Sequence, residues 1–120
     1  MTDRGQVRKV LDDLNALLAG VGGRDLYRVT EAAAVDGDRL VSAKIESRGP
    51  DGAVRRSFEA EEARFVLMAA SRSLEIRLRS GSVTYLGKRT VRFLDDEHTA
   101  YLEVDPAPFR TSGNPVITLR

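Results

Sequence analysis

The sequence contains no cysteine and no tryptophan, a single histidine, four phenylalanines and three tyrosines. Without cysteine the chain can form no disulfide framework, thiolate metal site or cysteine nucleophile. Its 19 Lys and Arg against 18 Asp and Glu give a formal net charge of +1, too small for long-range attraction to nucleic acid or an anionic membrane. The few aromatic residues cannot form a stacking platform for single strands. We therefore expect no nucleic-acid partner, no metal site and no cofactor.

Long apolar runs are also absent, and 42 % hydrophobic with 31 % charged residues is the composition of an ordinary soluble globular domain. A chain of 120 residues can bury one core but not two, so we expect a single domain over residues 1–120. The sequence shows neither a segment apolar enough to cross a bilayer nor the apolar core of a secretory signal. We expect that this chain does not itself span a membrane.

Apolar residues near the N-terminus recur at intervals of three and four, which is typical of an amphipathic helix. The spacing predicts a helix over residues 4–19, with Asp3 and Gln6 as a capping pair. Gly20, Gly22 and Gly23 are expected to end it, because glycine tolerates left-handed geometry. The apolar face consists of Val7, Val10, Leu11, Leu14, Leu17 and Leu18.

From Leu26 onward the apolar residues step by two between turn signals, which indicates antiparallel strands over residues 25–105, about seven to nine in number. Turns are expected at 36–38, 49–52 and 80–81, and a charged loop at 95–97. A helix through Phe58, Phe65 and Val66 is an alternative for one stretch. Residues 106–120 form a tail interrupted by proline, which could add one edge strand at its end.

Groups suited to catalysis are few. His98 is the only imidazole, and Glu59 and Glu61 would share one face of an extended segment. A small enzyme that uses these groups is the weakest of three hypotheses, because a solvated strand face and a charged loop explain the same residues. We expect no enzymatic activity.

The order of features resembles a known family. VRKVLDDLNALLAG leads into a strand and then DGDRLVSAKI, followed by GPDGAVRRSFEAEEARF and SRSLEIRLRSGSVTY. These segments, which fall within about residues 7–104, are similar to the periplasmic β-domain of the LptF/LptG (YjgP/YjgQ) permease subunits of the lipopolysaccharide-export ABC transporter. The A-x-x-A and L-x-L-x-L-x-(D/N)-G patterns of that family correspond to Ala60 to Ala63 and Leu74 to Gly81. The chain departs from the family in having no transmembrane helices.

The resemblance implies a mainly β fold, an antiparallel β-jellyroll or open sandwich, preceded by one N-terminal amphipathic helix. It also implies a non-enzymatic lipid-passage and docking module at the periplasmic face of the inner membrane. Its partners would be lipopolysaccharide or another envelope lipid, and other jellyroll domains that pair through strand edges. Arg77 and Arg79 are candidate contacts to lipid phosphates at the rim. The residues expected to line an apolar interior for acyl chains are Val41, Ile45, Phe58, Phe65, Leu74, Ile76 and Leu78.

The same residues allow a second interpretation. An alternating apolar set that faces inward can simply fill a closed core. The chain would then be an α+β domain that interacts with another protein. The two hypotheses differ in whether solvent can reach the apolar face.

Overall fold

The computed structural model describes residues 4–21, 25–85 and 88–120, without the side chains of residues 94–96. It contains one open β-sheet and an N-terminal helix, so the expected mainly β fold is confirmed at this level. The elements are α1 (Arg4–Ala19), β1 (Leu26–Glu31), β2 (Ala34–Asp36), β3 (Arg39–Arg48), β4 (Val54–Met68), β5 (Ser73–Tyr85), β6 (Arg89–Glu103), α2 (Pro106–Arg110) and β7 (Ile117–Leu119).

Helix α1 has the bounds that its apolar spacing predicts. Its buried side chains are Val7, Val10, Leu14 and Leu18. The Gly20 N–H donates to the Leu17 carbonyl and the Val21 N–H to the Leu18 carbonyl, which satisfies two of the last free carbonyls. The predicted contributions of Asp3, Gly22 and Gly23 fall outside the described residues.

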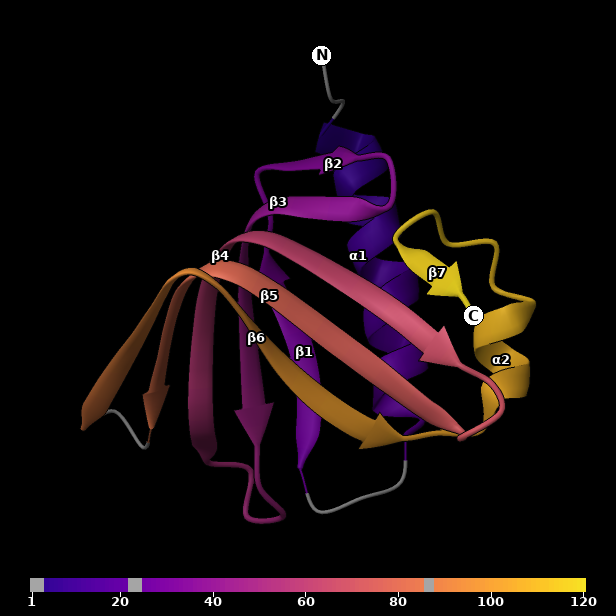
Figure 1. The fold of residues 1–120 in the computed structure, drawn as a ribbon. Coiled ribbons are helices and arrows are strands. Elements are labelled where there is room, and N and C mark those ends of the chain that lie inside the picture. Colours follow the sequence, from indigo (N-terminus) through magenta and orange to yellow (C-terminus); the bar gives the residue numbers. More distant parts are fainter. Residues whose placement is uncertain (1–3, 22–24, 86–87) are drawn as a thin grey trace.

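The sheet has the strand order β1-β3-β4-β5-β6, with all of these neighbours antiparallel. β2 pairs with β3 through the predicted turn at Gly37, and the β3–β4 hairpin closes at Gly52; both glycines have positive φ. β7 pairs with β4 in parallel, so the final edge strand exists but is not antiparallel. Figure 1 shows the long strands arching. In this view α1 lies between β1 on one side and α2 and β7 on the other.

The arch is a sharp bend that crosses three neighbouring strands. The register places Ser42 of β3 and Ser80 of β5 on either side of Glu61 of β4. Ser42 has φ 51° and Ser80 has φ 53°, in the left-handed region that non-glycine residues rarely adopt. Because these residues break the alternation of faces, the bend divides the sheet into two arms, defined here by β6: arm A carries residues 89–93 and arm B carries residues 97–103.

Gly81 lies beside this bend for a steric reason. A Cβ atom at this position would stand 1.8 Å from the Glu59 carbonyl oxygen and 2.7 Å from the Ala60 Cα. Both atoms belong to the backbone of β4, so neither can rotate away. The bend therefore requires glycine at position 81.

Two sequence predictions in this region are wrong. Ser80 and Gly81 form no turn, since β5 continues through them to Tyr85. Residues 95–97 are not a loop, because β6 runs unbroken from Arg89 to Glu103. The stretch through Phe58 and Phe65 is extended and forms part of β4, so the helical alternative for it does not apply. In each strand the bend imitates the break between two shorter strands.

The C-terminal tail contains a short helix that the alternation does not predict. Asp105 caps α2 by accepting a hydrogen bond from the Ala107 N–H, and Pro106 occupies the first turn. Farther along, the buried Asn114 side chain donates to the Val10 carbonyl of α1 at 3.0 Å and accepts from the Val116 N–H at 3.1 Å. The tail is thereby attached to the helix at the start of the chain.

The core lies between the concave face of the bent sheet and α1. Leu14 and Leu18 belong to one buried cluster with inward side chains from β1, β3, β4, β5 and β6, and Phe109 and Val116 add the C-terminal tail to it. One continuous hydrophobic cluster results, as expected for a single core.

Candidate functional site

Most of the residues expected to line a lipid passage lie inside the closed core. Each is at most 2 % exposed, and together they belong to the single hydrophobic cluster with α1. Solvent therefore does not reach them in this structure, as the closed-core interpretation expects. They are Ile45, Phe58, Phe65, Leu74, Ile76 and Leu78.

Val41 lies on the other face of the sheet. It was expected to share a face with Ala43 and Ile45, but the positive φ of Ser42 changes the alternation between them. Leu40 and Ala43 consequently point inward, and Val41 stands opposite Glu62 on the polar face. The placement of Val41 among inward residues is a correction that follows from the bend.

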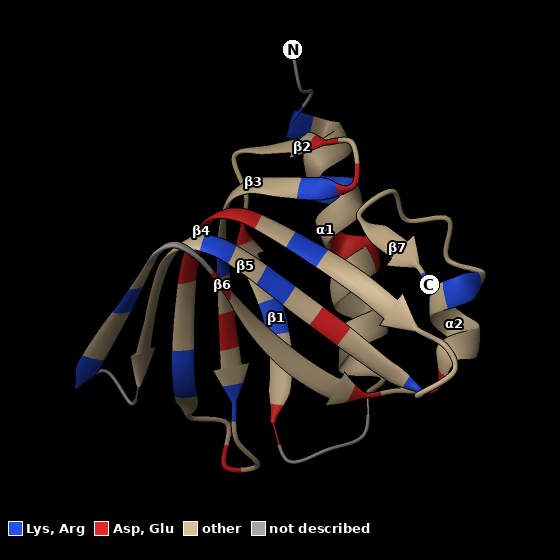
Figure 2. Ribbon diagram, in the orientation of Figure 1, with Lys and Arg blue, Asp and Glu red and all other residues tan. Residues whose placement is uncertain are grey.

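Arg77 and Arg79 lie on the outer face of arm B, away from the core. The Arg77 guanidinium donates from Nε and Nη2 to one carboxylate oxygen of Glu75, at 2.9 and 2.7 Å. Arg79 is exposed and stands opposite Glu62 and Glu97 on the neighbouring strands. Figure 2 shows acidic and basic positions interspersed along these strands, so this face has no single sign of charge.

His98 packs in an aromatic cluster. Its ring lies 5.7 Å from the Phe58 ring and 5.4 Å from the Phe93 ring, measured between centroids. Burial lowers the pKa of His98 below its usual value, and the nearby Arg56 guanidinium lowers it further. His98 is thus an aromatic packing element beside the bend, next to the strand position of Ser80.

Arg56 joins this cluster to β1. Its guanidinium lies over the rings of Tyr27 and Phe58, at 5.7 Å from each centroid, and donates a hydrogen bond to the Tyr27 hydroxyl. Burial raises the pKa of Tyr27, Arg56 lowers it in part, and Asp25 raises it. Since Arg56 also lies 3.8 Å from the Asp25 carboxylate, its charge is already partnered.

The carboxylates considered for catalysis do not meet His98. Glu59 and Glu61 line a shallow depression of about 280 Å³ at the bend, together with Lys44 and the serines of the neighbouring strands. Lys44 lies 4.0 Å from Glu59 and 3.3 Å from Glu31. Among the described residues, no group of three or more His, Asp or Glu is placed to hold a metal ion.

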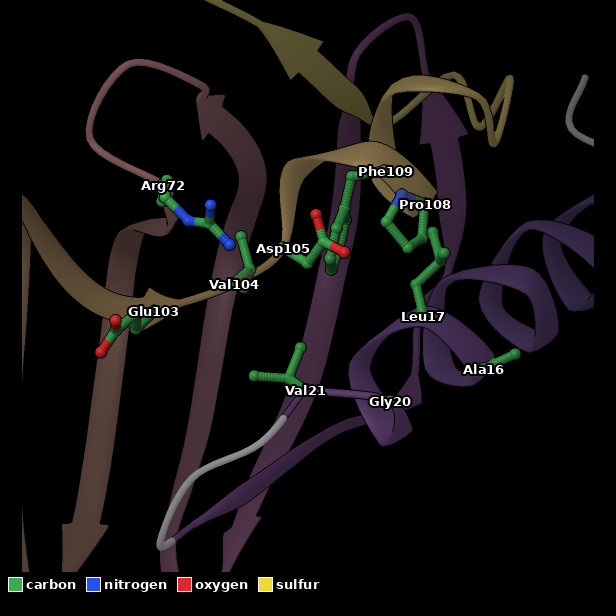
Figure 3. Close-up of a pocket in the computed structure, with 10 residues that line it drawn as sticks. All are labelled: Ala16, Leu17, Gly20, Val21, Arg72, Glu103, Val104, Asp105, Pro108 and Phe109. Carbon is green, nitrogen blue, oxygen red and sulfur yellow. The ribbon is translucent and has the colours of Figure 1, made fainter.

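A cavity of about 360 Å³ lies at the C-terminal end of α1 (Figure 3). Leu17 and Val21 line it from α1 and the segment after it, Phe109 from α2, and Arg72, Glu103 and Asp105 supply the charged part. The Asp105 carboxylate is engaged with the first turn of α2. This lining offers no nucleophile and no base that is held against one.

The two long edges of the sheet differ sharply. On the β1 edge, the Asn15 side chain accepts from the Val29 N–H and donates to the Val29 carbonyl, both at 2.8 Å. A groove of about 620 Å³ lies between α1 and β1, and Asn15 and Val29, which these hydrogen bonds join, are among the residues that line it. The helix thus occupies the hydrogen-bonding positions that an added strand would need.

The β6 edge has no such cover. Among the described residues, β6 pairs with β5 alone along its whole length. Its side chains include two of the large exposed hydrophobic residues of the chain, Val91 at 44 % and Tyr101 at 69 % exposure. We identify this edge, β6 from Arg89 to Glu103, as the candidate site.

Comparison of the chain with family models, with curated proteins and with solved structures finds no match. In the part of the chain that the structure describes, none of the helices has the length and hydropathy needed to cross a bilayer. The resemblance to the lipopolysaccharide-export permeases stays a prediction, carried by the residue patterns alone.

Proposed function

We propose that this chain is a non-enzymatic docking domain that binds an extended strand of another β-sheet domain along the free edge of β6. The proposal keeps the strand-edge pairing that the resemblance implies, and it agrees with the hypothesis of an interaction domain with a closed core. The observation that carries it is the contrast between the β1 edge, closed by Asn15, and the uncovered β6 edge with Val91 and Tyr101 exposed.

Sheet extension supplies both affinity and selectivity. The free N–H and C=O groups of an edge strand form main-chain hydrogen bonds with the incoming strand, whatever its sequence. Side chains on the two faces then select the partner through cross-strand pairs. On β6, Val91 stands opposite Val83 on the inner face and Tyr101 opposite Glu75 on the outer face. An added strand would cover both.

Photo-crosslinking in cells that naturally make the protein tests this proposal. A photoreactive amino acid at Tyr101 or Val91 should give adducts to a protein chain, with the crosslinked peptide identified by mass spectrometry. Leu119 and Leu26 are matched controls, because they are similarly exposed hydrophobic residues away from β6, at 54 % and 47 %. Equal labelling from all four positions, or none from β6, would contradict edge docking.

Lipid passage is a second candidate, and the strong bend of one open sheet with a largely apolar concave face favours it. The two arms would play the part of the two layers of a jellyroll. Because α1 fills the space between them, acyl chains could enter only if the helix moved away. Photo-crosslinking from Ile76 or Phe65 to lipopolysaccharide tests this candidate, and the absence of adducts from both positions would exclude it.

A further inference from the structure

The charge along β6 is divided between its two halves. Arg89 and Arg92 are exposed at its start, directly after the exposed Lys88, and Glu97 and Glu103 are exposed in its second half. Figure 2 shows the basic positions at the beginning of this strand. Among the side chains that the structure describes, none of the three cations lies within 4.0 Å of a carboxylate. Within the part of the chain whose side chains are described, the basic half of the free edge therefore forms no ion pair.

A strand with this pattern is complementary to a reversed copy of itself. We infer that the partner bound at the β6 edge is the β6 strand of a second copy of this chain, which gives a two-fold symmetric dimer with a continuous sheet. This inference rests on the proposed docking function and names its partner. Antiparallel pairing of the two copies brings the basic half of each strand to the acidic half of the other.

The division of faces limits the register, and the exposed Arg92 and Tyr101 favour one of the registers that it allows. Residues that lie directly opposite must point to the same face of the extended sheet. Val91 and Leu102 both face inward, since they pair with the buried residues Val83 and Leu74. Placing Val91 opposite Leu102 of the second copy puts Arg92 opposite Tyr101 on the outer face.

This register provides partners for the exposed side chains of Val91, Arg92 and Tyr101. The Arg92 guanidinium meets the exposed Tyr101 ring, a favourable cation–π pair, and has Glu103 as its diagonal neighbour. Val91 is covered by Leu102 instead of water.

The bend is compatible with the two-fold axis. Residues 89–93 lie in arm A and residues 97–103 in arm B, so the pairing joins arm A of one copy to arm B of the other. An axis along the bisector of the bend exchanges the two arms and keeps both concave faces on the same side. Because Asn15 closes the opposite edge at β1, assembly stops at two copies and forms no fibre.

Cysteine pairs test the register directly, since the natural chain has no cysteine. The double variant R92C/Y101C places two exposed thiols opposite each other in the dimer, and mild oxidation should link copies covalently. Within one copy these residues lie in opposite arms and cannot meet. The matched control is V91C/Y101C, whose positions are also exposed but are offset by one residue and point to opposite faces.

Sedimentation velocity of the natural chain over a hundredfold concentration range should show a monomer–dimer equilibrium. V91K/Y101K should raise the dissociation constant of this equilibrium at least tenfold. A chain that stays monomeric throughout, or equal crosslinking of R92C/Y101C and V91C/Y101C, overturns the inference. If Tyr101 still labels a different protein in cells, the docking function stands without self-pairing. If Tyr101 labels no protein chain, both the docking function and the self-pairing are refuted.

Discussion

Replacing Asn15 with alanine should destabilise the fold, because this one side chain satisfies both edge-facing groups of Val29. The two hydrogen bonds, each 2.8 Å long and half-buried, have no replacement within the helix. At about 1 kcal/mol per bond their loss costs about 2 kcal/mol. Alanine has the better helix propensity, which offsets about 0.6 kcal/mol of this loss. We expect the free energy of unfolding to fall by about 1.5 kcal/mol, the difference between these terms.

Urea titration at neutral pH measures this change. For a chain of this size it corresponds to a fall in Tm of roughly 6 °C. The control is Asp13→Ala, at an exposed position on the same helix. This substitution also improves helix propensity, but it removes neither of the two hydrogen bonds to Val29. The two variants should therefore differ by about 2 kcal/mol. Amide hydrogen exchange at Val29 supplies a local readout, since its N–H loses protection only in Asn15→Ala.

Asn15→Asp separates the donor from the acceptor. The aspartate still accepts from the Val29 N–H, but its second oxygen faces the Val29 carbonyl. This repulsion favours the protonated carboxyl in the folded state, so its pKa is raised above the unfolded value. The variant is therefore destabilised by this repulsion above the folded pKa, and it regains stability as pH falls through that pKa. If Asn15→Ala matches Asp13→Ala in stability and in Val29 exchange, Asn15 does not close the edge.

Three other positions give simpler tests by denaturant unfolding. Gly81→Ala should cost about 3 kcal/mol or more, since its Cβ meets the β4 backbone, whereas Gly113→Ala has open space and should cost about 1 kcal/mol for its positive φ. Asn114→Ala should cost about 2 kcal/mol by leaving the Val116 N–H and the Val10 carbonyl unpaired. The lowered pKa of His98 makes the unfolded state bind its proton first, so stability should fall as pH drops below about 6.5. His98→Phe, which keeps the ring packing, should reduce that slope, and an unchanged slope would show that other groups cause it.

The elements whose signals are local could be predicted from the sequence. Helix α1 follows from apolar spacing, and the turns at Gly37 and Gly52 follow from residues that favour positive φ. The bend could not be predicted, because Ser80 and Gly81 carry the same local signal as a hairpin turn. The bend differs from a hairpin turn in the spacing of the inward-facing residues. On three neighbouring strands, two successive inward-facing residues are three positions apart instead of two. These spacings, visible once the register is known, are Leu40 to Ala43, Ala60 to Ala63 and Leu78 to Gly81.

The candidate site depends on strand order, which alternation does not encode. Every strand of the sequence presents an apolar and a polar face, but only the sheet order shows that β6 has one neighbour and that Asn15 covers β1. The two exposed apolar residues of β6, Val91 and Tyr101, point to opposite faces and form no single stripe in the sequence. The Val41 error has the same origin, since the face of a residue beyond the bend depends on the backbone of Ser42.

Edge docking and lipid passage make opposite demands on α1, and Asn15→Ala separates them. Docking leaves the helix in place, so the variant should associate through β6 as the natural chain does, because Asn15 lies at the far edge of the sheet. Lipid passage requires the helix to leave the concave face, where Leu14 and Leu18 pack among the inward residues. Weakening its attachment should then increase crosslinking from Ile76 to lipopolysaccharide. An increase at Ile76 favours passage, whereas unchanged labelling together with unchanged association favours a permanently closed core.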